Sequence, residues 1–240
     1  MSHWFISDLH LDTTRPGITD LFLRFLRDLP AEVESLFILG DLFEAWIGDD
    51  AIGDLERGVA EGIRAVAQRG VNVRFMRGNR DFLLGRDYCE RAGMRLLPDA
   101  CVLDIGGLPT LLLHGDTLCT DDHAYQAFRR QVRDPAWIEG FLAKDVAQRT
   151  AFALQARAAS QQHQQQVGET ITDVNADEVA ATFRRYGVSR IIHGHTHRPA
   201  IHPATADCPG ERIVLGDWYE QGSRLTIGRD GSTRLTSFPA

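Results

Sequence analysis

The chain has 240 residues, of which 43% are hydrophobic and 25% charged, a balance typical of a globular protein rather than a disordered or fibrous one. Its formal net charge of −7 argues against a general nucleic-acid binder, because such binding depends on Lys and Arg releasing counterions from phosphates. No uninterrupted apolar stretch approaches the roughly 20 residues that cross a bilayer, and the first residues lack the pattern of a signal peptide. We therefore expect a cytoplasmic protein, which can still lie on a membrane.

Short apolar runs alternate with amphipathic stretches in the first third of the chain. We expect buried strands at Trp4–Ser7, Leu36–Leu39 and Val71–Met76. Between them, Ile18–Leu29 and Ile52–Gln68 carry apolar residues at three- and four-residue spacing, which predicts helices that cover a sheet. This alternation indicates an α/β fold.

Farther along, the pattern changes to hairpins. Cys101–Ile105 and Thr110–Leu113 flank a Gly-Gly-Leu-Pro turn, and Leu225–Ile227 and Thr233–Thr236 flank an Arg-Asp-Gly turn. Because hairpins are antiparallel and the earlier strands are joined by helices, we predict a sandwich of two mixed β-sheets flanked by helices. The four cysteines show no C-x-x-C spacing, which fits reduced thiols rather than a zinc site or disulfides.

A helical lid insertion is predicted at residues 121–172, where no convincing strand occurs. Three helices are expected there: Ala124–Val132, Trp137–Leu142 and Val146–Gln166. Asn175, followed three residues later by a glutamate, resembles a capping box for a helix ending near Tyr186. The chain then returns to the sheets at Arg190–Ile192. We predict one domain over residues 1–240, with the insertion inside it.

Potential metal ligands follow five of the predicted strands: Trp4–Ser7, Leu36–Leu39, Val71–Met76, Thr110–Leu113 and Arg190–Ile192. Because the loops at the carboxyl ends of strands converge in α/β folds, we expect these side chains to meet in one crevice. The candidates are Asp8, His10, Asp41, Asn79, His114, His195 and His197. Alternate side chains of a strand project to the same side, which pairs Asp8 with His10 and His195 with His197.

The donor set is made of carboxylate, imidazole and amide groups, which suits Mn²⁺, Fe²⁺, Zn²⁺ or Mg²⁺. Two ions about 3.5 to 4 Å apart need a bridging ligand, and a carboxylate is the natural one. A lone D-x-H or G-H-x-H is more often incidental. Five such pieces, in this order and with these glycines, together indicate a metal site.

The order D-x-H, G-D, G-N-x-[DE], H-G-D, G-H-x-H resembles the calcineurin-like metallophosphoesterase superfamily. The resemblance implies two divalent metal ions, with Mn²⁺ the expected metal, bridged by Asp41. It adds three ligands to each site: Asp8, His10 and His197 to the first, and Asn79, His114 and His195 to the second. Strand parity alone also nominates His193. The resemblance excludes it, so we interpret His193 as a histidine behind the ligands or in the core.

Arg80 distinguishes this chain from most of the superfamily, which has G-N-H-[DE] where this sequence has Gly78-Asn79-Arg80-Asp81. An arginine cannot release a proton near neutral pH, so we expect Arg80 to neutralise phosphate oxygens in the transition state instead of acting as a general acid. The alternative is a structural ion pair with Asp81. With Asn79 and His195, Arg80 makes up the predicted catalytic set.

Four longer stretches closely resemble the family of UDP-2,3-diacylglucosamine diphosphatases: Phe5–Leu11, Gly40–Asp50, Arg77–Leu83 and Ile192–Pro199. Leu215–Trp218 agrees with this resemblance. It implies that metal-activated water attacks the α-phosphorus and hydrolyses the pyrophosphate bond to UMP and 2,3-diacylglucosamine 1-phosphate, in lipid A biosynthesis. It also implies a nucleotide-linked lipid substrate and a peripheral location on the cytoplasmic face of the bacterial inner membrane. We infer no protein partner.

Substrate contacts carried over by the resemblance are Asn79, Arg80, Asp122, Ser160, Gln164, Val167 and His195. Val167 departs from the family, which carries a Lys there, and valine cannot contact a phosphate electrostatically. Either the glutamines of residues 161–166 supply hydrogen bonds instead, or the matching position lies elsewhere. The apolar residues of the insertion have three interpretations: ordinary packing, a slot for acyl chains, or docking on a membrane with its basic residues.

Other functions compete with this hypothesis. Another dinuclear-metal phosphodiesterase or a nucleotide pyrophosphatase is the nearest, and Arg80 and the apolar insertion argue against it. A non-catalytic interaction platform is disfavoured because no candidate ligand is missing. The acidic balance of the chain disfavours a nuclease.

Overall fold

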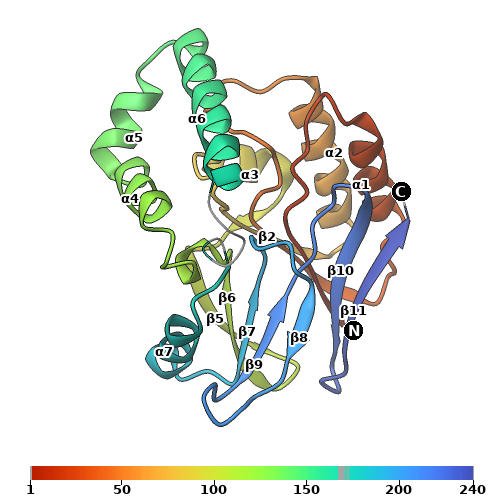
Figure 1. Ribbon diagram of the computed structural model, residues 1–240. Helices are drawn as coiled ribbons and strands as arrows, with labels where there is room; N and C mark the ends of the chain where they lie inside the picture. Colours follow the sequence, from red (N-terminus) through yellow and green to blue (C-terminus); the bar gives the residue numbers. More distant parts are fainter. Residues whose placement is uncertain (1, 167–170, 172, 240) are drawn as a thin grey trace.

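Two mixed β-sheets pack face to face in the computed structural model, with helices on their outer sides (Figure 1). The structure describes residues 2–166, 171 and 173–239. In spatial order, the six-stranded sheet contains β11 (Thr233–Pro239), β10 (Gln221–Gly228), β1 (Ser2–Ile6), β2 (Val33–Leu39), β3 (Asn72–Met76) and β4 (Arg95–Leu96). The five-stranded sheet contains β5 (Ala100–Ile105), β6 (Leu108–Leu113), β7 (Arg190–His193), β9 (Glu211–Val214) and β8 (Ala200–His202). The predicted fold class is confirmed.

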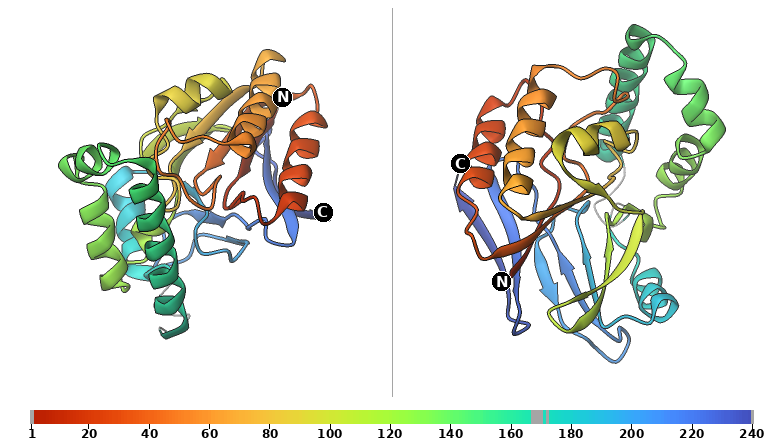
Figure 2. Two further views of the ribbon diagram at one scale, coloured as in Figure 1. Left: turned by 90° about the horizontal axis from the view of Figure 1, so that it is seen from above. Right: turned by 180° about the vertical axis from the view of Figure 1, so that it is seen from behind.

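The helices form separate groups around the sheets. Three helices lie by the six-stranded sheet: α1 (Pro16–Arg27), α2 (Asp54–Gln68) and α3 (Arg86–Ala92). Helix α7 (Ala176–Tyr186) packs on the five-stranded sheet. The remaining helices stand beyond the ends of the strands, as Figure 2 shows from behind: α4 (His123–Val132), α5 (Pro135–Leu142) and α6 (Val146–Gln166).

Alternation of side chains along the central strands explains the layers. In β1, Trp4 and Ile6 pack toward the helices, whereas Phe5 packs between the sheets, where it stacks on Phe37 of β2 at 4.7 Å. Both faces of these strands are buried, so they read as nearly continuous apolar runs. On the far side, Phe183 of α7 packs against the outer face of the five-stranded sheet.

The register of the parallel strands aligns the loops that follow them. Ile6 of β1 pairs with Ile38 of β2, and Leu39 pairs with Met76 of β3. In the other sheet Leu112 of β6 pairs with Ile192 of β7. The three strands β1, β2 and β3 therefore end at one edge, where Asp8 N donates to the carbonyl oxygen of Gly40 at 3.1 Å.

Most elements agree with the sequence predictions. Both hairpins are confirmed, since β5 pairs with β6 and β10 with β11 in antiparallel register. The three helices expected within residues 121–172 are present, and Asn175 caps α7 by accepting from Glu178 N at 3.0 Å. The sequence did not predict five short elements: η1 (a 3-10 helix, Asp116–Leu118), α3, β4, β8 and β9. The division into one domain and a lid insertion stays a prediction.

Candidate metal centre

The structure brings the seven candidate ligands to one place beyond the strand ends. Asp8, His10 and His197 form a first cluster, in which His197 Nε2 lies 3.3 Å from both Asp8 Oδ1 and His10 Nε2. Asp41 Oδ2 lies 3.7 Å from His10 Nε2. Ligand atoms of Asp8, Asp41 and His114 also lie within 4.8 Å of one another, which joins this cluster to a second one.

The second cluster is centred on an amide oxygen. Asn79 Oδ1 lies 2.8 Å from His114 Nε2 and 2.8 Å from His195 Nδ1. Asp41 Oδ2 is 3.7 Å from His114 Nε2, the same distance that separates it from His10 in the first cluster. One carboxylate oxygen therefore faces both clusters, which is the arrangement of a bridging ligand.

The backbone at the centre adopts a rare conformation. Five described residues other than glycine have a positive φ between 49° and 68°, and all five are candidate ligands: Asp8, His10, Asp41, His195 and His197. This left-handed region is unfavourable for residues with a Cβ, and such strain typically marks functional sites. The convergence of Asp8 with His10 and of His195 with His197 thus depends on left-handed turns beyond the strands, not on strand alternation.

Close backbone approaches explain two of the glycines in the motifs. A Cβ on Gly40, whose φ is 90°, would lie 2.6 Å from His114 Nδ1 and from the Cα of Gly78. A Cβ on Gly194 would collide with the Asp8 carboxylate and the Ser7 side chain. Only glycine lets these loops come close enough for their neighbours to share a site.

Three of the imidazoles are held from behind by an oxygen acceptor. His10 Nδ1 lies 3.0 Å from Glu44 Oε2, and His197 Nδ1 lies 3.2 Å from Asp217 Oδ2. His114 Nδ1 donates to the carbonyl oxygen of Leu39 at 2.8 Å. An oxygen in this position favours a proton on Nδ1, so the Nε2 atom of each ring is the one directed into the centre, as in metal sites of known proteins.

These orienting groups were not predicted as site residues. Glu44 and Asp217 stood within the motif stretches without an assigned role, and the Leu39 carbonyl belongs to the backbone. Neither their spacing nor their residue type points to a particular histidine, since they lie 34 and 20 positions from the imidazoles they contact. Only the folded arrangement reveals the pairs.

The donor set fits divalent cations. His10 Nε2, His197 Nε2 and an Asp8 oxygen converge, and His114 Nε2 and His195 Nδ1 converge on Asn79 Oδ1. Once the facing nitrogens are deprotonated, these groups present lone pairs that a divalent cation can accept. The oxygen and nitrogen donors are those expected for two ions sharing Asp41.

The electrostatic field of the centre also favours cations. Burial opposes the charged form of His197, yet the hydrogen bonds that it donates to Asp217 and Asp8 raise its pKa to about 10. Burial likewise opposes the charged form of His114, but the Asp41 and Asp8 carboxylates raise its pKa above the ordinary value. His195 differs, because burial and the neighbouring His114 lower its pKa to about 4.

Asp81 and Arg80 do not form the ion pair considered as an alternative. Asp81 is fully buried and accepts from the backbone N–H groups of Gly78 at 2.8 Å and Leu42 at 2.7 Å. Burial and the neighbouring Asp41 raise the pKa of Asp81 to about 6. Arg80 instead extends to Glu44, with Nη1 3.7 Å from Oε1. Its guanidinium therefore stands beside the centre.

His193 lies outside both clusters. It is fully buried, and its Nδ1 donates to the carbonyl oxygen of Gly194 at 2.9 Å, while Arg212 Nη1 lies 3.1 Å from its Nε2. Burial and the Arg212 charge lower its pKa to about 3. A neutral histidine packed behind the ligand loop agrees with the interpretation made from the sequence.

The other predicted substrate contacts lie on the helices beyond the sheets. Asp122 is buried at the start of α4, where it accepts from Tyr125 N at 2.9 Å, and Ser160 is half-buried on α6. The side chain of Gln164 and the whole of Val167 lie outside the described residues. Their predicted contacts therefore stay predictions.

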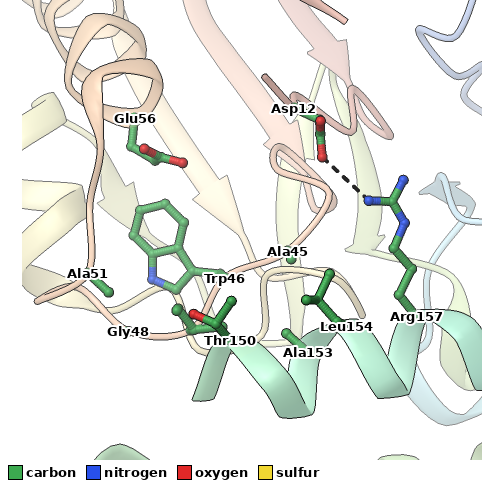
Figure 3. Close-up of a pocket in the computed structure, with 11 residues that line it drawn as sticks. Asp12, Ala45, Trp46, Gly48, Ala51, Glu56, Thr150, Ala153, Leu154 and Arg157 are labelled. Carbon is green, nitrogen blue, oxygen red and sulfur yellow. Dashed lines mark hydrogen bonds and ion pairs between the residues drawn. The ribbon is translucent and has the colours of Figure 1, made fainter. Parts of the chain in front are cut away.

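A pocket of about 230 Å³ opens between α6 and the loop after β2 (Figure 3). Trp46, Ala153 and Leu154 form apolar walls. At one end Arg157 Nη1 lies 3.4 Å from Asp12 Oδ2, and Arg157 Nε lies 3.3 Å from Glu44 Oε1. The pocket thus ends near the carboxylate that orients His10.

A second pocket of about 300 Å³ lies between α5 and α6, beside Trp137, Phe141 and Phe152. These three rings pack on one another, with centroid separations of 4.9 to 5.6 Å.

No helix in the described part of the chain has the length and hydropathy needed to span a bilayer.

Residues 1–199 match the family described as calcineurin-like phosphoesterase. The chain is 58% identical over 241 residues to a UDP-2,3-diacylglucosamine hydrolase of Xanthomonas campestris, a match that covers 96% of this chain and 97% of the relative. A relative of the same name from Xanthomonas axonopodis is 58% identical over 97% of this chain and 98% of its own length. A third, from Stenotrophomonas maltophilia, is 56% identical over 96% of both chains.

Proposed function

The chain belongs to the calcineurin-like phosphoesterase family, and from this premise we propose that it hydrolyses the pyrophosphate bond of UDP-2,3-diacylglucosamine. The single observation that carries the proposal is the convergence of the seven donors around Asp41 in a chain 58% identical, over 96% of its length, to a hydrolase of that name. The reaction breaks a phosphoanhydride with water and needs no nucleophilic Ser or Cys.

The metal ligands are proposed as two sets that share Asp41. The first set is Asp8, His10 and His197, and the second is Asn79, His114 and His195. Two divalent cations supply Lewis acidity to the phosphate and lower the pKa of the attacking water. We propose Mn²⁺ as the metal, since mixed oxygen and imidazole ligands suit it.

The residues of the chain itself orient and neutralise the substrate. Water attacks the α-phosphorus, a new P–O bond forms there, and the bond to the bridging oxygen breaks, giving UMP and 2,3-diacylglucosamine 1-phosphate. The departing phosphate is already a stable anion and needs no proton. Arg80, whose side chain is 19% exposed and only 3.7 Å from Glu44, is positioned to exchange that contact for a phosphate oxygen as charge builds up.

We propose that the helices beyond the strand ends contact the substrate. The residues proposed for these contacts are Asp122 and Ser160, with Gln164 and Val167 farther along the same segment. Asp122 is held by its capping bond to Tyr125 N, so its carboxylate has a fixed position at the start of α4. Gln164 stays in the set as a hydrogen-bonding residue.

We propose that the apolar pocket between α6 and the loop after β2 takes an acyl chain. It offers Trp46 and Leu154 as apolar walls, and it ends at Arg157 beside the centre, where the polar part of a lipid would lie (Figure 3). Leu142, Val146 and Leu154 are exposed at 39%, 45% and 63%, which supports contact between these helices and a membrane surface. The proposed location is the cytoplasmic face of the bacterial inner membrane, in lipid A biosynthesis.

Turnover of UDP-2,3-diacylglucosamine by the metal-free protein resupplied with Mn²⁺, in ¹⁸O-labelled water, tests the proposal. We expect UMP that carries the label, because attack occurs at the α-phosphorus. Label in the lipid phosphate instead would refute that site of attack. Soluble nucleotide diphosphates and aryl phosphates serve as comparison substrates, and equal rates on all of them would favour the alternative, a general phosphodiesterase or nucleotide pyrophosphatase.

A further inference from the structure

Arg133, the residue that follows the end of helix α4, contacts the loop carrying Asn79. Arg133 Nη2 donates to the carbonyl oxygen of Gly78 at 2.8 Å, and its Nη1 lies 3.2 Å from Asp99 Oδ2. The guanidinium also lies over the ring of Phe82, 5.3 Å from its centroid. The side chain is 15% exposed and is held by three neighbours, so its position is well defined.

The carbonyl that Arg133 binds belongs to the peptide bond that Gly78 forms with Asn79. Gly78 itself lies directly against Asp41, since a Cβ there would collide with the Asp41 carboxylate. Asn79 Oδ1 lies at the centre of the second cluster, 2.8 Å from both His114 Nε2 and His195 Nδ1. A rotation of this peptide would therefore change the direction of the Asn79 side chain directly.

The same helix also binds the loop that follows His114. Asp116 is 2% exposed, and its Oδ2 accepts from Tyr125 OH and from Arg129 Nε, both at 2.7 Å. Gln126 Nε2 donates to the Asp116 carbonyl oxygen at 2.8 Å. Two loops, each with one ligand of the second cluster, are thus bound to a single helix.

The first cluster has a different link to these helices. There the contact comes from α6, where Arg157 Nε lies 3.3 Å from Glu44 Oε1 and so reaches His10 through one carboxylate. The third ligand of the second cluster, His195, again lies near α4, with its ring 5.9 Å from that of Tyr125. The first cluster is therefore linked to α6, and the second to α4.

We propose that Arg133 is a positioning residue for Asn79 and that α4 sets the affinity of the second cluster for its metal ion. The inference rests on the proposed function only in that both clusters bind divalent cations. Helix α4 then supports the metal centre, in addition to its role in contacting substrate. Deleting one orienting contact of this kind typically weakens metal binding about 10- to 100-fold.

Mn²⁺ titration of the metal-free protein, followed by calorimetry and by the spin-coupled signal of a Mn²⁺ pair, tests the inference. For R133A we expect the affinity of one of the two ions to fall by about tenfold or more, with the other unchanged. The affinity of R133K for that ion should lie between those of R133A and the wild type, because lysine can donate to Gly78 but lacks the planar fork that also reaches Asp99. R130A removes an exposed arginine from the same helix and should bind both ions as the wild type does.

Thermal unfolding of the metal-free variants separates this role from a purely structural one. Equal weakening of both ions in R133A, together with a lower unfolding temperature, would overturn the inference, as would two unchanged affinities. If R133A does not fold, comparing the two Mn²⁺ affinities of R133K with those of R130A tests the same inference. A wild-type protein that binds fewer than two ions would instead reject the proposed metal pair itself, and this inference with it.

Discussion

The two clusters of the metal centre are built from similar ligands but are supported in different ways. Carboxylates lie behind the imidazoles of the first cluster, with Glu44 behind His10 and Asp217 behind His197. A backbone carbonyl lies behind His114 in the second, and its amide ligand depends on a peptide bound by α4. The first cluster is therefore tuned mainly by charge, and the second mainly by backbone geometry.

This difference accompanies a difference in the loops that build each cluster. The first cluster joins loops of β1 and β7 and has His197 at 27% exposure, so solvent reaches it. The second joins loops of β3, β6 and β7, and His114 is 2% exposed beneath them. Burial does not explain the difference, because Glu44 behind His10 is only 6% exposed and Asp116, on the loop after His114, is a buried carboxylate as well. The clusters differ in what contacts their ligands directly, which is carboxylates in the first cluster, and a backbone carbonyl and a bound peptide in the second.

Asp41 belongs to both clusters, so its substitution should have the largest effect. We expect Asp41→Ala to lower turnover of the UDP-linked lipid by more than about a thousandfold, beyond the loss for a single transition-state donor. Because Asp41 has a φ of 52°, Asp41→Asn is the matched variant that tolerates this backbone while removing the charge. Asp20→Ala, an exposed change on α1, is the control, and an Asp41→Asn variant with full activity would contradict the shared ligand.

Arg80 stands beside the clusters without belonging to either. We expect Arg80→Ala to lower kcat about a hundredfold, because it removes a cation that opposes charge developing on phosphate. Mn²⁺ stoichiometry should stay at the wild-type value, which distinguishes Arg80 from a ligand. Arg91→Ala, exposed on α3, should leave kcat unchanged, and loss of a metal ion in Arg80→Ala would place Arg80 in the support of the first cluster.

Removing the charged support should affect the first cluster alone. Glu44→Gln and Asp217→Asn keep the size of the side chains but lose the charge behind His10 and His197. We expect each to weaken one Mn²⁺ affinity by about 10- to 100-fold and to leave the other intact. When either variant is combined with R133A, which should weaken binding of the other ion, the losses of Mn²⁺ binding free energy should add. Equal effects of all three variants on both ions would show that the clusters are not separately supported.

The smallest expected effect concerns the rigidity of α4. Cys119 is 1% exposed beside the Asp116 loop, and burial raises its pKa to about 12, as burial also does for Cys89 in α3. Because the thiolate is the reactive form, only about one thiol in ten thousand is ionised at pH 8. We expect N-ethylmaleimide to modify Cys101 and Cys208 first and the two buried thiols at similar slow rates, read by mass spectrometry. Faster labelling of Cys119 than of Cys89 would show that α4 opens.

Sequence reasoning located the clusters, but for a reason that the structure corrects. It relied on alternation along strands, which would place His193 beside His195. In the structure β7 ends at His193, and the backbone then turns into the left-handed region at His195. The same change occurs after β1, at Asp8 and His10. Local sequence does not encode these turns for residues that normally avoid them; the packed loops impose them.

The short elements that were missed have a related cause. β8 and β9 carry three and four residues, and their pairing with each other and with β7 depends on a partner strand rather than on internal periodicity. Helix α3 has seven residues, too few for a clear apolar repeat. Long periodic stretches such as α2 and α6 were predicted nearly to their ends, because each contains several turns of its own pattern.

The sequence by itself determined the two sheets, the hairpins, the helices between residues 121 and 172, and which polar residues follow the strands, because each of these depends on local periodicity and turn chemistry. The tertiary structure alone decided which carboxylates lie behind His10 and His197. It also decided the contact of Arg80 with Glu44 and the hydrogen bond from Arg133 to the carbonyl oxygen of Gly78. Those contacts join residues between 20 positions apart, as for Asp217 and His197, and 55 positions apart, as for Arg133 and Gly78. Such pairs form only when the sheets pack, since no local pattern carries their distance or direction.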